Sequence, residues 1–95
     1  MKIRWTTPAT RQLKSAFDFV AEASERTARK MVMRIWKAAD VLRRHPAAGR
    51  KGRVAGTREL VVRGTPFVVA YQLRKNVVEI LAVWHTARKW PESFA

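Results

Sequence analysis

The sequence predicts an α+β fold: an N-terminal strand and an antiparallel helical hairpin packed on a mainly antiparallel sheet, which three C-terminal strands complete. Three observations support this prediction. Apolar residues recur at helical spacing through the first half, and strand-like apolar runs fill the second half. The chain has 95 residues, the size of one domain with one core, so residues 1–95 should form a single domain. The hairpin would then cover one face of the sheet.

The first two elements are a strand and a helix. Residues 2–6 alternate charged with apolar or aromatic side chains, which predicts a short strand with its apolar side chains on one face. Thr7 is a suitable N-cap and Pro8 a suitable first helical residue. We therefore expect a helix that begins here and ends near Ala23.

The second helix should follow at once. Ser24 is another N-cap, and Pro46 predicts the end of the helix. Its apolar stripe repeats every 3.6 residues and comprises Ala28, Met31, Val32, Ile35, Ala38, Ala39 and Leu42. Its other face is basic, with Arg29, Lys30, Arg34 and Lys37. With almost no residues between them, the two helices should form an antiparallel hairpin.

The second half reads as a loop and three strands. Residues 46–57, rich in glycine and basic residues, predict a loop. The strands are expected at about 58–63, 66–73 and 77–84, with short hairpin turns at 64–65 and 74–76. The last two are almost continuously apolar, as expected of strands that are mostly covered. Among the aromatic residues, Tyr71 should be a core residue with a hydrogen-bonded hydroxyl, and Trp5, Trp36 and Trp84 should lie in or beside the core.

The charge of the chain predicts a negatively charged partner. The formal net charge is +13, and from Arg43 onward eleven Lys and Arg face only three acidic residues. We expect this excess on the sheet face opposite the helices, in the long loop and in the tail. The chain has no cysteine and no apolar run of about 18 residues, so we expect a cytoplasmic protein without disulfides or a membrane span.

The candidate site residues are mainly basic. No phosphate-binding loop is present, and two histidines are too few for a histidine metal cluster, so neither a metal nor another cofactor is expected. The densest basic region comprises Arg50, Lys51, Arg53, Arg58 and Arg63, which would either grip phosphates or form a solvated surface. His85 would act as a general acid/base or cap the last strand. Trp90 and Phe94 would stack on bases or pack the tail onto the domain.

Three segments carry a family resemblance. Residues 52–62 (GRVAGTRELVV), 65–71 (TPFVVAY) and 78–90 (VEILAVWHTARKW) resemble the RelE/ParE toxin superfamily, the toxins of bacterial type II toxin–antitoxin, or plasmid-stabilisation, systems. The resemblance spans nearly the whole chain and implies the fold described above. It also implies two partners: an antitoxin with an acidic or amphipathic segment, and a target that is either DNA gyrase or ribosome-bound mRNA.

The resemblance favours the gyrase-inhibiting ParE branch. The ribosome-dependent nucleases of the RelE branch use basic residues on the central strands, and Glu59, Val61 and Val68 occupy the matching positions here. A ParE-like inhibitor implies target contacts from Arg50, Lys51, Arg53, Arg63, Lys89 and Trp90. The alternative is an mRNA endoribonuclease. There, His85 would be the acid/base, Arg58 and Arg88 would bind the phosphate, and Trp90 would stack on a base.

Overall fold

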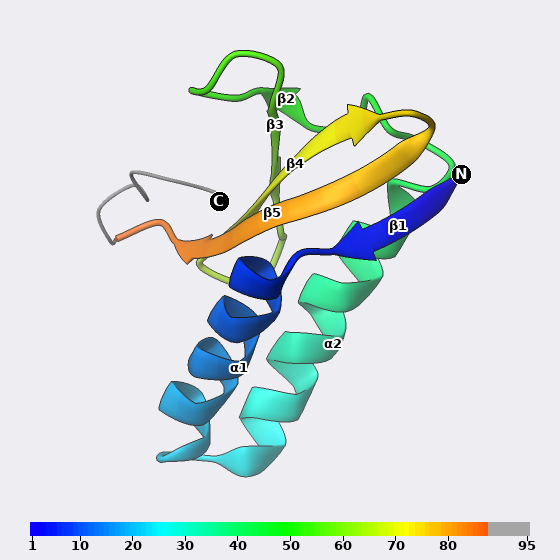
Figure 1. Ribbon diagram of the computed structural model, residues 1–95. Helices are drawn as coiled ribbons and strands as arrows, with labels where there is room; N and C mark the ends of the chain where they lie inside the picture. Colours follow the sequence, from blue (N-terminus) through cyan, green and yellow to red (C-terminus); the bar gives the residue numbers. More distant parts are fainter. Residues whose placement is uncertain (88–95) are drawn as a thin grey trace.

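A computed structural model describes residues 1–87 and has two helices packed on one face of a five-stranded mixed sheet (Figure 1). The elements are β1 (Lys2–Trp5), α1 (Thr7–Ala21), α2 (Glu25–Val41), β2 (Arg50–Lys51), β3 (Arg58–Val61), β4 (Phe67–Arg74) and β5 (Val77–His85). The strand order is β1-β5-β4-β3-β2; β1 is parallel to β5 and every other pairing is antiparallel. The predicted fold class is confirmed.

The first helix begins one residue earlier than the sequence suggested. Its N-cap is Thr6 and not Thr7, because the extended backbone of β1 continues through Thr6. The Thr6 hydroxyl accepts a hydrogen bond from the Ala9 amide at 3.4 Å and donates one to the Ile80 carbonyl at 2.7 Å. One side chain therefore starts α1 and fastens it to β5, while the helix ends at Ala21.

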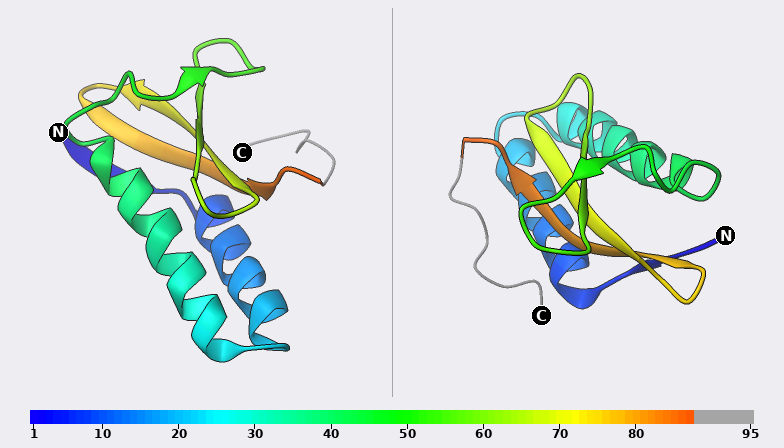
Figure 2. Two further views of the ribbon diagram at one scale, coloured as in Figure 1. Left: turned by 180° about the vertical axis from the view of Figure 1, so that it is seen from behind. Right: turned by 90° about the horizontal axis from the view of Figure 1, so that it is seen from above.

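The second helix begins as predicted and completes the hairpin. The Ser24 hydroxyl accepts a hydrogen bond from the Thr27 amide at 3.2 Å. Figures 1 and 2 show both helices beneath the sheet, leaning away from it toward the turn that joins them. No helix within residues 1–87 is long and apolar enough to cross a membrane.

The core lies between the hairpin and the sheet. Its largest fully buried side chains include Ile35 and Leu42 from the region of α2, and Tyr71 and Ile80 from the sheet. A second, smaller buried cluster contains Val68, Ala70, Ala82 and Trp84. Side chains alternate between faces along a strand, which puts this cluster on the face away from the helices.

The three tryptophans within residues 1–87 do not share one environment. Trp5 is half-buried and packs against the main core, as predicted. Trp84 is buried, but in the smaller cluster. Trp36 is 48% exposed, so its assignment to the core margin was wrong. The side chain lines a surface hollow together with Ile3 and Trp5 of β1.

The strand boundaries differ from prediction where turns set them. A short strand, β2, forms inside the predicted 46–57 loop and pairs with β3. β3 stops at Val61, because the Val62 carbonyl accepts a hydrogen bond from the Thr65 amide and starts the turn. β4 extends one residue beyond its predicted end, because only Lys75 and Asn76 form the turn to β5, and β5 ends one residue later than predicted, at His85. Lys75 and Asn76 both have positive φ, 50° and 60°, as tight two-residue hairpin turns require.

Tyr71 holds the loop after α2 against the sheet. The side chain is fully buried, and its hydroxyl donates to the Pro46 carbonyl at 2.7 Å and accepts from the Gly49 amide at 2.9 Å. The prediction of a core tyrosine with a hydrogen-bonded hydroxyl is confirmed. A Cβ on Gly49 would lie 2.7 Å from the Tyr71 ring, so the close approach requires glycine.

Candidate functional site

The sheet face opposite the helices, here called the open face, is less basic than the sequence suggested. Its described side chains include Glu59, Val61, Val68, Ala70, Glu79, Ala82 and Trp84. Glu59 and Glu79 are buried carboxylates, and each pairs with an arginine that reaches this face. Arg53 lies over Trp84 on this face, and the side chains of Arg4 and Arg50 are 59% and 61% exposed, so the expected basic surface is present but is partly neutralised by the two carboxylates.

Glu59 fixes the loop that carries much of the predicted phosphate-binding region. It is only 3% exposed, and its carboxylate accepts hydrogen bonds from the Arg53 amide at 3.0 Å and the Arg50 guanidinium at 3.3 Å. The Arg53 guanidinium lies over the Trp84 ring, 5.3 Å from its centroid. Two arginines predicted to bind phosphate thus contribute to the structure of the domain itself.

Glu79 forms a second ionic cluster at the other side of the open face. Its carboxylate accepts hydrogen bonds from Arg4 and from the Gln72 amide nitrogen, the latter at 2.9 Å. The Arg4 hydrogen bond, followed by that from Gln72, lowers the pKa of Glu79 below its ordinary value of 4.5. The carboxylate is therefore held ionised and committed to Arg4.

Arg58 lies on the helix side of the sheet and binds the loop that follows α2. Its guanidinium donates to the Gly49 carbonyl at 2.7 Å and the Ala47 carbonyl at 3.4 Å. Lys51 is exposed on the neighbouring short strand. Of the predicted basic region, Arg50, Lys51, Arg53 and Arg58 therefore come together around the loop, whereas Arg63 lies in the distant β3–β4 turn.

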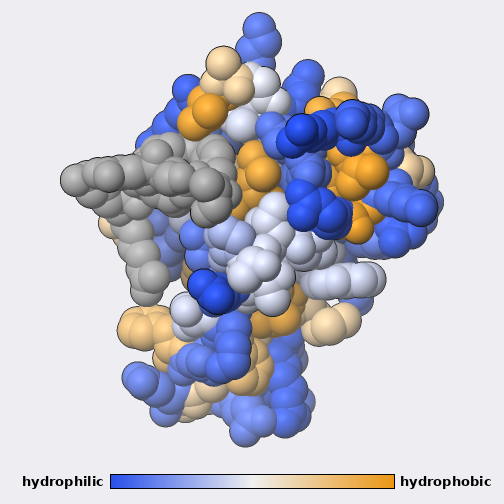
Figure 3. All heavy atoms as spheres, in the orientation of Figure 1, coloured by the Kyte–Doolittle hydropathy of each residue, from blue (hydrophilic) through white to orange (hydrophobic). Residues whose placement is uncertain are grey.

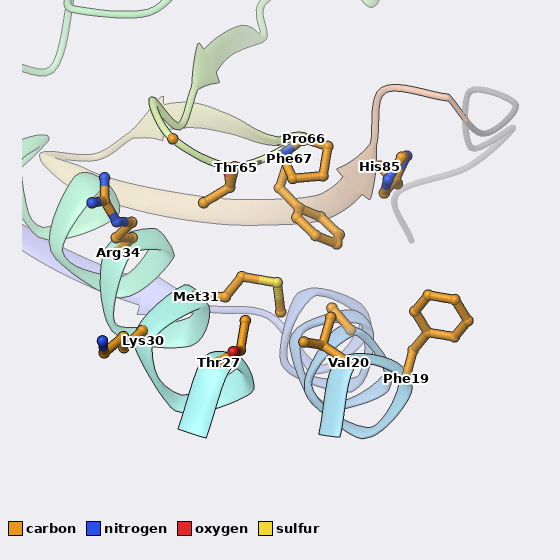
Figure 4. Close-up of a pocket in the computed structure, with 12 residues that line it drawn as sticks. Phe19, Val20, Thr27, Lys30, Met31, Arg34, Thr65, Pro66, Phe67 and His85 are labelled. Atoms are coloured by element: carbon orange, nitrogen blue, oxygen red, sulfur yellow. Dashed lines mark hydrogen bonds between the residues drawn. The ribbon is translucent and has the colours of Figure 1, made fainter. Parts of the chain in front are cut away.

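His85 ends β5 on the helix side of the sheet. Its ring meets that of Phe67 edge-on, with centroids 5.3 Å apart, and its Nδ1 accepts a hydrogen bond from the Ala87 amide at 3.0 Å. Figure 4 shows the ring beside Pro66 and Phe67 at the mouth of a pocket. The geometry is that of the strand-capping histidine the sequence allowed.

Arg58 and His85 lie far apart. Arg58 of β3 pairs with Tyr71 of β4, whereas His85 of β5 pairs with Phe67, at the other end of the same half of β4. Four residues of strand span about 13 Å, and the two residues sit on strands to either side of β4. Within residues 1–87, no group of three or more His, Cys, Asp or Glu could hold a metal ion. The predicted site residues Arg88, Lys89 and Trp90, and also Phe94, lie outside the described residues.

A groove that the sequence analysis missed lies between the helical hairpin and the β3–β4 turn. It has a volume of about 380 Å³, and its apolar lining includes Val20, Met31 and Phe67. Lys30 and Arg34 stand at its side (Figure 4). Phe19, at its edge, is 66% exposed. The sequence contained one indication of this groove: Phe19 is a large apolar residue that lies outside the predicted buried side of α1.

The β3–β4 turn is tied to α2 at this groove. The Arg34 guanidinium donates to the Arg63 carbonyl at 3.4 Å. Gly64 has φ 79°, a conformation that favours glycine, and an added Cβ would lie 2.5 Å from that guanidinium, which would have to shift. In the view of Figure 3, hydrophilic and apolar side chains are interspersed over both the sheet and the helices.

Comparisons with known proteins converge on one family. The family described as ParE toxin of type II toxin–antitoxin systems, parDE, matches residues 3–90. The toxin candidate Y4kP of Sinorhizobium fredii is 38% identical over 91 residues, covering 96% of this chain and 94% of that protein. Toxin RelE2 of Caulobacter vibrioides is 34% identical over 87 residues, covering 92% and 97% respectively.

Solved structures give the same fold. A chain of the chromosomal ParDE system from P. aeruginosa superimposes with a TM-score of 0.82 at 26% identity, covering 90% of this chain and 95% of that one. A chain of the RelBE2 toxin–antitoxin complex from Mycobacterium tuberculosis does so with a TM-score of 0.67, also at 26% identity, covering 88% and 95%. Relatives of this chain thus carry the names of both branches.

Proposed function

This chain belongs to the ParE toxin family of type II toxin–antitoxin systems, and we propose that it is a cytoplasmic, growth-arresting toxin that inhibits DNA gyrase by binding it. A cognate antitoxin would neutralise it. Since a binding inhibitor performs no chemistry of its own, its surface needs complementarity to a partner and not a set of reacting groups.

One observation carries this proposal: the open face lacks the basic residues that a RelE-like nuclease would use there. The matching positions are Glu59, Val61 and Val68. The Glu59 carboxylate is buried and bound to Arg50, Val68 is buried, and only Val61, 49% exposed, is available to a partner. Stabilising the charge that develops on a cleaved phosphate requires cations or donors aimed at it, and none of these three supplies one.

A second observation agrees. The nuclease alternative needs His85 and Arg58 at one phosphate, yet they lie more than about 13 Å apart on the helix side of the sheet. His85 Nδ1 is also engaged with the Ala87 amide. A general acid/base must come within about 3 Å of the atom it serves, directly or through one water.

The mRNA endoribonuclease remains the second candidate, because RelE2 of Caulobacter vibrioides is 34% identical to this chain. In that function His85 would transfer the proton, Arg58 and Arg88 would bind the phosphate, and Trp90 would stack on a base. Arg50, Lys51, Arg53, Arg63, Lys89 and Trp90 are the target contacts in the gyrase proposal.

Induction of the toxin in growing cells separates the two functions. A gyrase inhibitor should trigger the DNA-damage response and leave translated mRNA intact, and His85→Ala should arrest growth as the unaltered chain does. Cleavage of translated mRNA that His85→Ala abolishes would overturn the proposal in favour of the nuclease. Growth unaffected by the unaltered chain would refute toxicity itself.

We further propose that the antitoxin lays an amphipathic segment in the groove between the hairpin and the β3–β4 turn. The groove offers an apolar floor with cations beside it, which fits a helix that presents apolar residues on one face and acidic residues at its margin. Both solved relatives named above come from toxin–antitoxin systems. Phe19, exposed at the groove edge, would gain most from being covered.

Titration calorimetry with the purified antitoxin tests this docking site. Phe19→Glu removes apolar area and adds a charge of the antitoxin's own sign, so affinity should fall at least tenfold. Val41→Glu is the matched control, because Val41 is 51% exposed, similarly apolar, and outside the groove lining. It should change the affinity less than about threefold. Equal effects of the two substitutions would show that the antitoxin does not recognise the groove.

A further inference from the structure

The outer face of α2 carries a stripe of cations that extends from the margin of the groove to surface that neither the groove nor the open face includes. Arg26, Lys30, Arg34 and Lys37 are all exposed. At 3.6 residues per turn they fall within an arc of about 80°, centred about 140° from the buried Ile35. Arg63 extends this row from the β3–β4 turn, where its carbonyl accepts the Arg34 hydrogen bond. We call these five residues the α2 stripe.

The cations of the α2 stripe take part in none of the ion pairs found within residues 1–87. Those pairs are Arg4–Glu79, Lys14–Asp18, Arg29–Glu25, Arg43–Asp40 and Arg50–Glu59. Both acidic residues of α2 are thus bound to arginines outside the stripe. Like charges three or four residues apart on a helix repel, so the stripe costs the folded domain stability. A partner that binds the stripe would offset this cost.

The geometry points to a nucleic-acid backbone. The row from Arg26 to Lys37 spans about 16 Å along the helix, enough to reach phosphates across a major groove about 12 Å wide. B-form DNA admits an α-helix there, whereas the deep, narrow major groove of A-form RNA does not. The exposed apolar residues beside the row, Met33 and Val41, line no part of the apolar groove. Phosphates need cations and not buried apolar area, so the charges of the row suffice to bind them.

We propose that the α2 stripe binds the phosphate backbone of duplex DNA. This inference rests on the proposed function, because a toxin bound to gyrase would lie close to the DNA that gyrase holds. Lys30 and Arg34 also line the groove. An antitoxin seated in the groove would cover two of the five stripe cations, so neutralisation and DNA binding would exclude each other.

The test measures binding of the purified toxin to a fluorescent 25-base-pair duplex by anisotropy, without gyrase. Five phosphate contacts predict a slope of log K against log salt of about −4 to −5. The stripe variant is Arg26→Gln, Lys30→Gln, Lys37→Gln. The control is Lys2→Gln, Arg11→Gln, Arg44→Gln, which changes three exposed cations elsewhere. Each triple lowers the formal net charge from +13 to +10, so bulk charge is matched.

The stripe variant should lose at least tenfold in affinity and about three units of slope, whereas the control should change both much less. Lys30→Arg with Lys37→Arg, which keeps the charge, should bind as the unaltered chain does, and far-ultraviolet circular dichroism checks that each variant is folded. Equal losses in the two triples, or no salt-dependent DNA binding by the unaltered chain, would overturn the proposal. Tighter stripe-dependent binding to a poly-glutamate peptide than to the duplex would replace DNA with an acidic protein. Because no gyrase is present, failure here leaves the gyrase proposal standing.

Discussion

The two sides of this domain use their charges in opposite ways. On the open face the carboxylates of Glu59 and Glu79 are buried, and each is bound to an arginine. On the helix side, the four α2 cations of the α2 stripe project into solvent and take part in no ion pair found within residues 1–87. One side therefore uses charge to hold the fold together, and the other leaves it available to partners.

This difference shows why a net charge of +13 does not identify a nuclease. Arg4 and Arg50 are each bound to a buried carboxylate, so moving either guanidinium fully onto a substrate would leave that carboxylate unpaired, although the exposed parts of both side chains can still contact a partner. The cations of the α2 stripe are exposed and follow α2 as far as the β3–β4 turn, where Arg34 donates to the Arg63 carbonyl. The predictions that follow test this contrast between a structural open face and a partner-binding helix side.

The largest expected effect is on stability, from the tryptophan of the open face. Trp84→Ala should lower the free energy of unfolding by about 3–5 kcal/mol, because Trp84 is buried in the smaller cluster. Trp36→Ala, on the helix side at 48% exposure, should cost about 1 kcal/mol or less. Urea unfolding of both variants provides the measurement. Similar losses would contradict the distinction between the two surfaces.

A smaller effect should come from the buried carboxylate of the loop. Glu59→Ala should cost about 1–3 kcal/mol, since it removes the acceptor of the Arg53 amide and the partner of Arg50. Asp18→Ala breaks the exposed pair with Lys14 and serves as the control, with an expected loss of about 0.5 kcal/mol or less. Urea unfolding again measures both. A Glu59 effect no larger than that of Asp18 would show that this carboxylate does not hold the loop.

The smallest effect is a pH dependence from Glu79. Its folded-state pKa lies below the ordinary 4.5, so the ionised group stabilises the fold above that value and the stabilisation is lost as pH falls through the lower folded pKa. Glu79→Gln should therefore reduce the thermal midpoint at pH 6 and differ progressively less from the unaltered chain toward pH 3. A difference that stays constant over this range would mean that Glu79 gains nothing from Arg4.

Most of the fold could be predicted, because the spacing of apolar residues along the sequence reflects which side chains are buried. The apolar residues predicted to form the buried side of the second helix include Met31, Ile35, Ala39 and Leu42, and all four are buried in the core. Element ends were harder to predict, since single side chains and turns decide them. Thr6 and Thr7 have the same chemistry, and only the pairing of β1 with β5 makes Thr6 the cap.

The site was predictable only in part, because spacing along the chain does not reveal partners across the sheet. Glu59 reads as a missing basic residue, and nothing local indicates that it binds Arg50 and the Arg53 amide. Arg58 and His85 looked like members of one set, yet the sheet register separates them. The groove arises from the lean of the hairpin away from the sheet, a tertiary feature that no local pattern carries (Figure 1).

The most direct test of the central claim, inhibition by binding and without nuclease chemistry, is a supercoiling assay with purified DNA gyrase and relaxed plasmid. The unaltered toxin should inhibit supercoiling, His85→Ala should inhibit at the same concentration within about threefold, and purified antitoxin should restore activity to both. Full gyrase activity in the presence of toxin, together with His85-dependent mRNA cleavage in a translation extract, would contradict the account.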